Sequence, residues 1–144
     1  MLAGLALAVP AVAAINWRLV ADGVAHGAPV ATTTAYVALD RAATSGAFSA
    51  RLPAAAKGKV AATDFSKTGL VVIYGEFGCR DSLIAVSSLE QHGTTLTVTL
   101  AQRQAKPGTA VCMAIFATYR ILSFDKTALR RPYPTRATVT LAPA

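Results

Sequence analysis

The clearest pattern of hydrophobic and polar positions lies between residues 82 and 103. From Thr94 to Arg103, leucine and valine at positions 96, 98 and 100 alternate with threonine at 95, 97 and 99. Alternation with a period of two is typical of a strand that buries one face. The run Ser82 to Leu89 precedes this segment, and Glu90-Gln91-His92-Gly93 separates the two. We therefore predict a hairpin that packs one face on the core.

A second kind of run predicts a central strand. Gly69 to Glu76 (GLVVIYGE) is a dense series of hydrophobic and β-branched residues, which is typical of a strand buried on both faces. Residues 15–27 predict an N-terminal strand in which Trp17 and Leu19 face the same way, with Trp17 in the core. Further β patterns lie at 110–117, 119–124 and 135–141, and the last of them follows a proline-containing loop.

One segment has the spacing of a helix. Tyr36, Leu39 and Ala43 recur at intervals of three and four, threonines before them offer a cap, and Gly46 would end the helix. Phe48 to Thr63 shows no period, and we predict an irregular surface loop there. Together these elements predict a mainly β fold: an antiparallel sandwich or rolled sheet of about six or seven strands with one short N-terminal helix.

The N-terminus, Met1 to Ala14, is uncharged, almost wholly apolar and ends in small residues, as signal peptides do. A membrane-spanning helix needs roughly 20 apolar residues, and Pro10 breaks this shorter run, so we expect no transmembrane segment. Cleavage after Ala13 or Ala14 would leave residues 15–144 as a single domain, secreted or held in the periplasm or cell envelope. No Lys or Arg precedes the run, which keeps a buried N-terminal strand or helix as the alternative.

Composition narrows the class of partner. Hydrophobic residues make up 53% of the chain and charged residues 15%, so the chain can bury enough apolar surface to fold. The net charge of +7 favours association with acidic surfaces. We expect no nucleic acid, because the basic residues are scattered and form no stripe with interleaved aromatics. The nearest basic patch is Arg130-Arg131-Pro132-Tyr133, with a solvated loop as the alternative interpretation.

The two cysteines, Cys79 and Cys112, stand 33 positions apart (112 − 79). In an exported chain we predict that they form a disulfide. Catalytic thiol chemistry would need a positioned base, but His26 and His92 both stand beside glycine in turn-like sequence. No close pair of metal ligands occurs in the chain, so we expect neither a metal nor a cofactor.

Most of residues 17–126 resembles the C-terminal domain of the PrcB family of envelope proteins, whose type member is a subunit associated with a surface protease complex. The best-matched pieces are Asp64-Phe65-Ser66 before the apolar strand, the hairpin at Gly93, and residues 112–126. The chain departs from the family in two places. A Gly-Gly-Tyr type loop is expected near residues 78–81, and a proline is expected where Thr118 stands. The resemblance implies a non-catalytic subunit that binds or stabilises a protease.

These observations leave two hypotheses about function. The first is an exported, non-catalytic protein-binding module of the cell envelope that presents loop residues to a protein partner, either a protease or an acidic surface. Its candidate partner-binding residues are Glu76, Phe77, Arg80, Asp81, Arg130, Arg131 and Tyr133. The second is a small secreted hydrolase in which Glu76 and Asp81 act as a carboxylate pair. Serine hydrolysis is not indicated, because no serine stands in a Gly-x-Ser-x-Gly turn.

Overall fold

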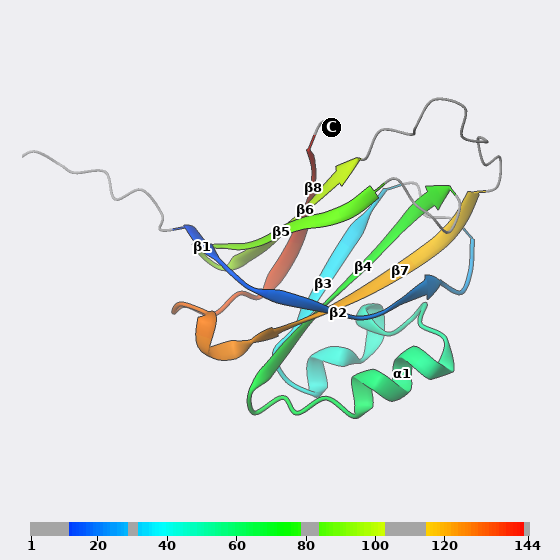
Figure 1. The fold of residues 1–144 in the computed structure, drawn as a ribbon. Coiled ribbons are helices and arrows are strands. Elements are labelled where there is room, and N and C mark those ends of the chain that lie inside the picture. Colours follow the sequence, from blue (N-terminus) through cyan, green and yellow to red (C-terminus); the bar gives the residue numbers. More distant parts are fainter. Residues whose placement is uncertain (1–11, 29–31, 79–83, 103–114, 143–144) are drawn as a thin grey trace, which may run out of the picture.

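Two four-stranded sheets pack face to face in the computed structural model, and a layer of helices covers one of them (Figure 1). The structure describes residues 12–28, 32–78, 84–102 and 115–142. The strands in this part of the chain are β1 (Val12–Ala14), β2 (Trp17–Val24), β3 (Thr34–Ala38), β4 (Thr68–Gly78), β5 (Ile84–His92), β6 (Thr95–Gln102), β7 (Ile115–Asp125) and β8 (Arg136–Ala142). The helical elements are η1 (Ala42–Thr44), η2 (Gly46–Phe48), α1 (Ala54–Ala61) and η3 (Lys126–Ala128).

The order of the strands is β1-β5-β6-β8 in sheet A and β2-β7-β4-β3 in sheet B. All neighbours are antiparallel except β6 and β8, which are parallel. Only two residues separate β1 from β2, so the N-terminal stretch passes directly from one sheet into the other and joins them along one side. The mainly β sandwich predicted from the sequence is confirmed, with eight described strands instead of six or seven.

The core between the sheets is built by alternate positions of the predicted hairpin and central strand. Leu96, Val98 and Leu100 of β6 are fully buried, as the alternation with threonine predicts. They pack with Val71 and Ile73 of β4 in a single apolar cluster. The opposite side chains of β4 are buried in a second cluster on the other face of sheet B. The prediction that β4 is central and buried on both faces is therefore confirmed.

The helical layer covers that second face of sheet B (Figure 1). Ala56 and Val60, four positions apart on one side of α1, are buried together with Phe48 and Leu52. Tyr74 of β4 joins the two layers by a polar contact as well, since its hydroxyl donates to the carbonyl of Phe48 at 2.5 Å. Sheet A has no such layer among the described residues, so its outer face, rich in threonine, is open.

The predicted helix was wrong. Thr34–Ala38 is the edge strand β3, paired with β4 in the register Ala35 to Ile73 and Val37 to Val71. The period of two prevails here because Ala35 and Val37 face the core between the sheets, while Ala38 packs under the helical layer. Tyr36 lies edge-on to Tyr74 at a centroid distance of 6.2 Å.

The predicted irregular loop was also wrong in part, because it contains α1 and the end of η2. Pro53 immediately precedes the helix, where its missing N–H costs nothing, and three alanines follow it. At the N-terminus, Trp17 is partly buried against the inter-sheet cluster, whereas Leu19 is 51% exposed. Ala13 and Ile15 are buried, and β1, which pairs with β5, lies within the segment predicted as a signal peptide.

In the described part of the chain, we find no helix with the length and apolar character that crossing a bilayer requires.

Candidate binding site at the arginine loop

The candidate site is the connection between β7 and β8, residues 129–135, which we call the arginine loop. β7 ends at Asp125, and η3 follows at once. The Asp125 carboxylate starts this turn by accepting hydrogen bonds from the Thr127 N–H at 2.9 Å and the Thr127 hydroxyl at 2.8 Å. Both bonds stabilise the ionised carboxylate, so they lower the pKa of Asp125. The chain therefore enters the arginine loop from a capped, well-defined turn.

Gln91 holds the backbone of the arginine loop. This residue of β5 is only 3% exposed, and its carboxamide nitrogen donates to the carbonyls of Arg130 at 2.8 Å, Gly93 at 2.9 Å and Pro132 at 3.3 Å. Its carboxamide oxygen accepts the backbone N–H of Arg130 at 2.8 Å. One buried side chain thus satisfies polar main-chain groups of both the β5–β6 turn and the arginine loop. Sheet A therefore fixes the loop, although the loop starts after β7 of sheet B and ends at β8 of sheet A.

Both ends of the arginine loop are anchored. Leu129 packs against the inter-sheet core at the start, and Pro134 is buried near the end. The N–H of Thr135 donates to the carbonyl of Thr94 at 2.9 Å, immediately before β8 pairs with β6. An exposed segment held in this way loses little conformational freedom when a partner binds.

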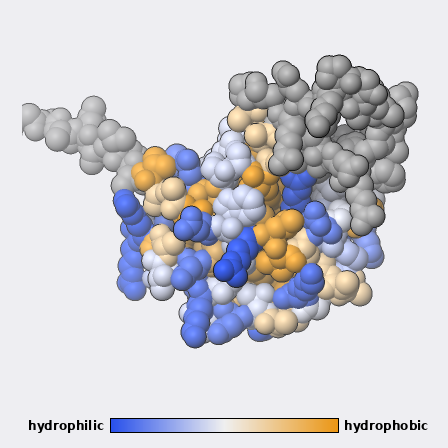
Figure 2. Space-filling model, in the orientation of Figure 1, coloured by the Kyte–Doolittle hydropathy of each residue, from blue (hydrophilic) through white to orange (hydrophobic). Residues whose placement is uncertain are grey.

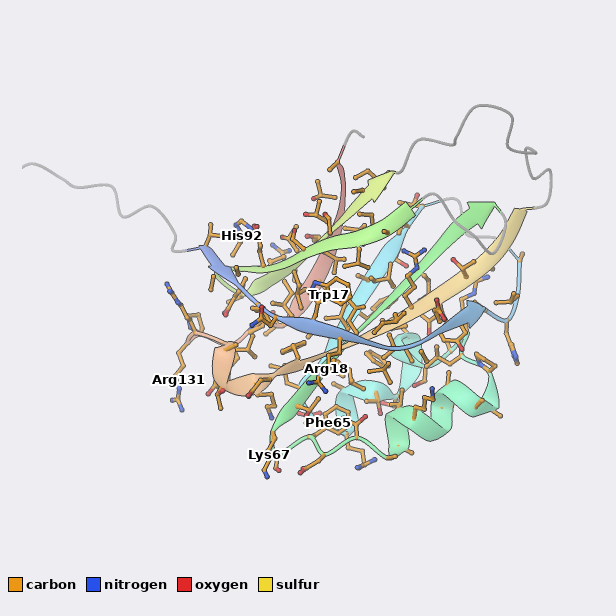
Figure 3. The ribbon with its side chains drawn as sticks, in the orientation of Figure 1. Trp17, Arg18, Phe65, Lys67, His92 and Arg131 are labelled. Atoms are coloured by element: carbon orange, nitrogen blue, oxygen red, sulfur yellow. The ribbon has the colours of Figure 1, made fainter. Side chains whose placement is uncertain are left out.

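The side chain of Arg131, which lies between these anchors, points outward (Figure 3). Arg130 and Arg131 are exposed, and Tyr133 is 47% exposed. The guanidinium carbon of Arg131 lies 5.4 Å from the centroid of the Tyr133 ring, which is a cation–π geometry. The loop therefore offers two guanidinium groups and an amphipathic aromatic ring on a fixed backbone.

The acidic side chains that flank the loop interact with residues close to them in the sequence. Glu90 lies 3.0 Å from His92, Oε2 to Nε2, and Asp125 caps Thr127 as described above. Arg136, the first residue of β8, donates from Nε to the hydroxyl of Thr95 at 3.0 Å. Figure 2 shows hydrophilic residues along this left-hand edge and a gathering of hydrophobic residues near the middle of the same face. The arginine loop thus lies at a polar edge of the molecule.

The other predicted partner-binding residues lie elsewhere. β4 and β7 pair with Thr68 opposite Asp125 and Gly78 opposite Ile115. Glu76 and Phe77 therefore lie at the end of sheet B remote from the arginine loop, about 25 Å along the strand from Thr68 at ~3.3 Å per residue. Arg80 and Asp81 lie outside the described residues, as do Cys79 and Cys112. Among the predicted residues that the structure describes, Glu76 and Phe77 therefore lie apart from Arg130, Arg131 and Tyr133.

The residues that carry the family resemblance have structural roles here. Asp64 accepts from the hydroxyl of Ser66 at 2.6 Å and from its N–H at 3.0 Å, which lowers the pKa of Asp64 and forms the turn before β4. Phe65 packs against the helical-layer cluster. Lys126 donates from Nζ to the carbonyls of Phe65 at 2.7 Å and Leu39 at 2.8 Å. These contacts tie the ends of three strands together, so these residues contribute to the fold.

Thr118, where the family is expected to have proline, lies in β7 between two neighbouring strands. It pairs with Val24 of β2 and Gly75 of β4, and its hydroxyl donates to the carbonyl of Gly75 at 3.2 Å. A proline at an interior strand position would remove a donor from the ladder. The threonine here therefore favours continuous pairing on both sides of β7.

A second surface feature is a hollow of about 340 Å³ between the edge strands β3 and β8 and the η1–η2 turns. It is lined by Ala35, Tyr36, Val37, Ala43, Ser45, Ala47, Phe48, Arg136 and Ala137. The one charged residue among these has its Nε bound to Thr95. The hollow is apolar and has no set of converging polar groups of the kind that fixes a small ligand.

Among the described residues, no three His, Cys, Asp or Glu side chains gather closely enough to hold a metal ion. Comparisons of the chain with protein-family models, with curated proteins and with solved structures found no match.

The sequence identified the exposed residues of the arginine loop but missed Gln91, which was grouped with the hairpin turn. A signal was present, because Gln91 stands two positions after Leu89, on the face of β5 that is buried. A polar residue at an inward register position needs buried hydrogen-bond partners. Its partners, 39 and 41 positions away in the sequence, could not be named from the pattern alone.

Proposed function

We propose that this protein is an exported, non-catalytic binding module that recognises a protein partner through the arginine loop. The observation that carries the proposal is the clamp by Gln91, which holds the backbone of Arg130 and Pro132 while Arg131 and Tyr133 stay exposed. Arginine and tyrosine are the residue types that most often dominate the energy of protein interfaces. A fixed loop that presents both is suited to recognition.

The proposed compartment is the cell envelope or the extracellular space. It rests on the apolar N-terminal segment and on the proposed disulfide between Cys79 and Cys112. The register of sheet B supports that disulfide, because Gly78 lies directly opposite Ile115. Cys79 follows Gly78 by one residue in the sequence, and Cys112 precedes Ile115 by three.

The resemblance to the PrcB family supports a protease, or a protein of a protease complex, as the partner. Binding would stabilise or restrain that partner without chemistry by this chain. The alternative hydrolase gains no support, since Asp81 and the side chain of Glu76 lie outside the described part of the structure.

Site-specific photo-crosslinking in the natural producing cells tests the proposal. A benzophenone amino acid replaces Tyr133 in one variant and Tyr36 in a matched control, because Tyr36 is another exposed tyrosine, on β3 and outside the loop. We expect a discrete crosslinked protein from position 133 and none from position 36. The absence of a discrete product at position 133, or the same products from both positions, would refute recognition through the arginine loop.

A further inference from the structure

We propose that the ligand of the arginine loop is a short acidic segment of the protein partner, bound through its Asp and Glu carboxylates. This inference rests on the proposed function and adds the chemistry of recognition. Its starting point is that the loop presents two adjacent guanidinium groups, from Arg130 and Arg131, on a backbone that sheet A holds in place.

Neither guanidinium group has a carboxylate partner within the described residues, and the nearby Glu90 pairs with His92 instead. The acidic groups on the adjoining elements are engaged elsewhere, Glu90 by that pair and Asp125 by Thr127. A guanidinium presents parallel N–H donors that match the two oxygens of a carboxylate. The arginine loop therefore provides two donor groups for carboxylates, and the described part of the chain supplies no carboxylate to either of them.

Tyr133 adds a third contact for such a segment. Arg131 lies over its ring, an arrangement that orients the guanidinium and reduces the rotamer freedom it would lose on binding. The phenol hydroxyl can also donate to a carboxylate oxygen. Two charges and one aromatic group within four residues suit a short, defined acidic segment.

The charges around the loop favour an acidic protein over a polyanion such as polyphosphate or nucleic acid. Long polyanions are bound by a continuous basic stripe, in which each phosphate contact adds to affinity. Here the carboxylates of Glu90 and Asp125 lie on the elements that flank the loop, and both are at the surface. They interrupt the positive surface and would repel the continuation of a polyanion, while leaving room for a short segment.

Binding of defined probes to the full-length protein provides the test. The probes are a short Asp- and Glu-rich peptide, the same peptide with Asn and Gln, and inorganic polyphosphate, each fluorescently labelled and measured by anisotropy. The variants are the double substitution Arg130→Gln with Arg131→Gln and a charge-matched control, Lys57→Gln with Lys59→Gln. Both lysines are exposed and lie on α1, in the helical layer of sheet B.

We expect the acidic peptide to bind and its affinity to fall about tenfold or more in the arginine variant, because charge-assisted hydrogen bonds are lost. The lysine variant should stay within about twofold of the parent protein, as remote surface charges contribute little. The neutral peptide should not bind. Equal losses in the two variants, or polyphosphate binding more tightly than the acidic peptide, would overturn the inference in favour of general polyanion attraction.

Crosslinking at position 133 tests the proposed function independently of the peptide-binding experiment. A specific crosslinked partner together with no binding of the acidic peptide would reject the carboxylate chemistry while leaving partner recognition intact. The absence of a crosslinked product at position 133 would instead reject recognition of a partner through the arginine loop.

Discussion

Gln91 and Arg130 are joined by two hydrogen bonds of 2.8 Å, one in each direction between the buried carboxamide and the arginine backbone. The side chain of Arg130 takes no part in either bond and stays at the surface. Folding and recognition are therefore divided within one residue: its main chain belongs to the core network, and its guanidinium is available to a partner.

Substitution of Gln91 tests this network. Gln91→Leu keeps much of the side-chain volume but leaves the Arg130 N–H and several carbonyls without their partner, which should lower the free energy of unfolding by about 2 to 3 kcal/mol. Gln91→Glu should cost more at neutral pH, because a buried negative charge would face carbonyl oxygens. Urea unfolding followed by circular dichroism measures both.

The neighbouring exposed residue provides the control for this network. His92→Ala should change stability by less than about 0.5 kcal/mol. If Gln91→Leu were as mild as His92→Ala, the loop would not depend on the carboxamide for its position.

Tyr74 should make stability sensitive to alkali. Burial raises the pKa of its phenol to about 12 from the usual 10.0 of tyrosine, so folding favours the neutral form. This contribution is complete below pH 10 and is lost as the pH rises from 10 towards 12, an effect of about 2 to 3 kcal/mol.

Urea midpoints recorded across that range test the expectation. Tyr74→Phe should show a weaker loss of stability with pH than the parent protein, at the cost of the bond to Phe48. Tyr133→Phe, which changes an exposed tyrosine, serves as the control and should follow the parent curve. Parallel curves for the parent and Tyr74→Phe would show that the phenol is not the titrating group.

Lys126 is expected to contribute to stability although it carries a charge. Its ammonium group donates to the carbonyls of Leu39 and Phe65, and it is partly buried. Lys126→Met retains the apolar stem but removes both bonds, so the free energy of unfolding should fall by about 2 to 3 kcal/mol. Lys67→Met, at an exposed position in the turn before β4, should have little effect. An equal effect of the two substitutions would contradict the role of Lys126 as a tie between strand ends.

The proposed disulfide predicts a large effect of reduction. Linking Cys79 to Cys112 closes a loop of 33 positions (112 − 79), for which the chain-entropy model gives roughly 3 to 4 kcal/mol. Protein from an oxidising compartment should resist alkylation of both thiols until it is reduced, and reduction should lower its urea midpoint. Cys79→Ser with Cys112→Ser should match the reduced protein. Two freely alkylated thiols in the unreduced, unfolded protein would exclude the bond.

The sequence predicted correctly those strands whose own residues show which of their faces are buried. In β6 the alternation of leucine and valine with threonine places one face on the core, and in β4 both faces are apolar because each meets a separate cluster. The helical spacing of Tyr36 and Leu39 misled because it extends across the end of β3, where pairing with β4 outweighs weak local preference. α1 was missed since Ala56 and Val60 form only a narrow apolar side.

The arrangement of distant elements could not be predicted in the same way. β8 has a clear strand pattern, yet its parallel pairing with β6 is decided by the route of the arginine loop across the end of the sandwich. The same holds for the site. The sequence pattern indicated Arg130 and Tyr133 as an exposed basic and aromatic pair. The residue that fixes their backbone is Gln91 of β5, which stands 39 positions before Arg130.

The most direct test of recognition through the arginine loop combines charge reversal with the crosslinker at position 133. Arg130→Glu with Arg131→Glu should reduce the yield of the crosslinked partner by about tenfold or more, since like charges would face an acidic partner. Lys57→Glu with Lys59→Glu, on α1, changes the net charge equally and should leave the yield near that of the parent protein. An unchanged yield after reversal of the two arginines, in a variant that remains folded, would contradict the account.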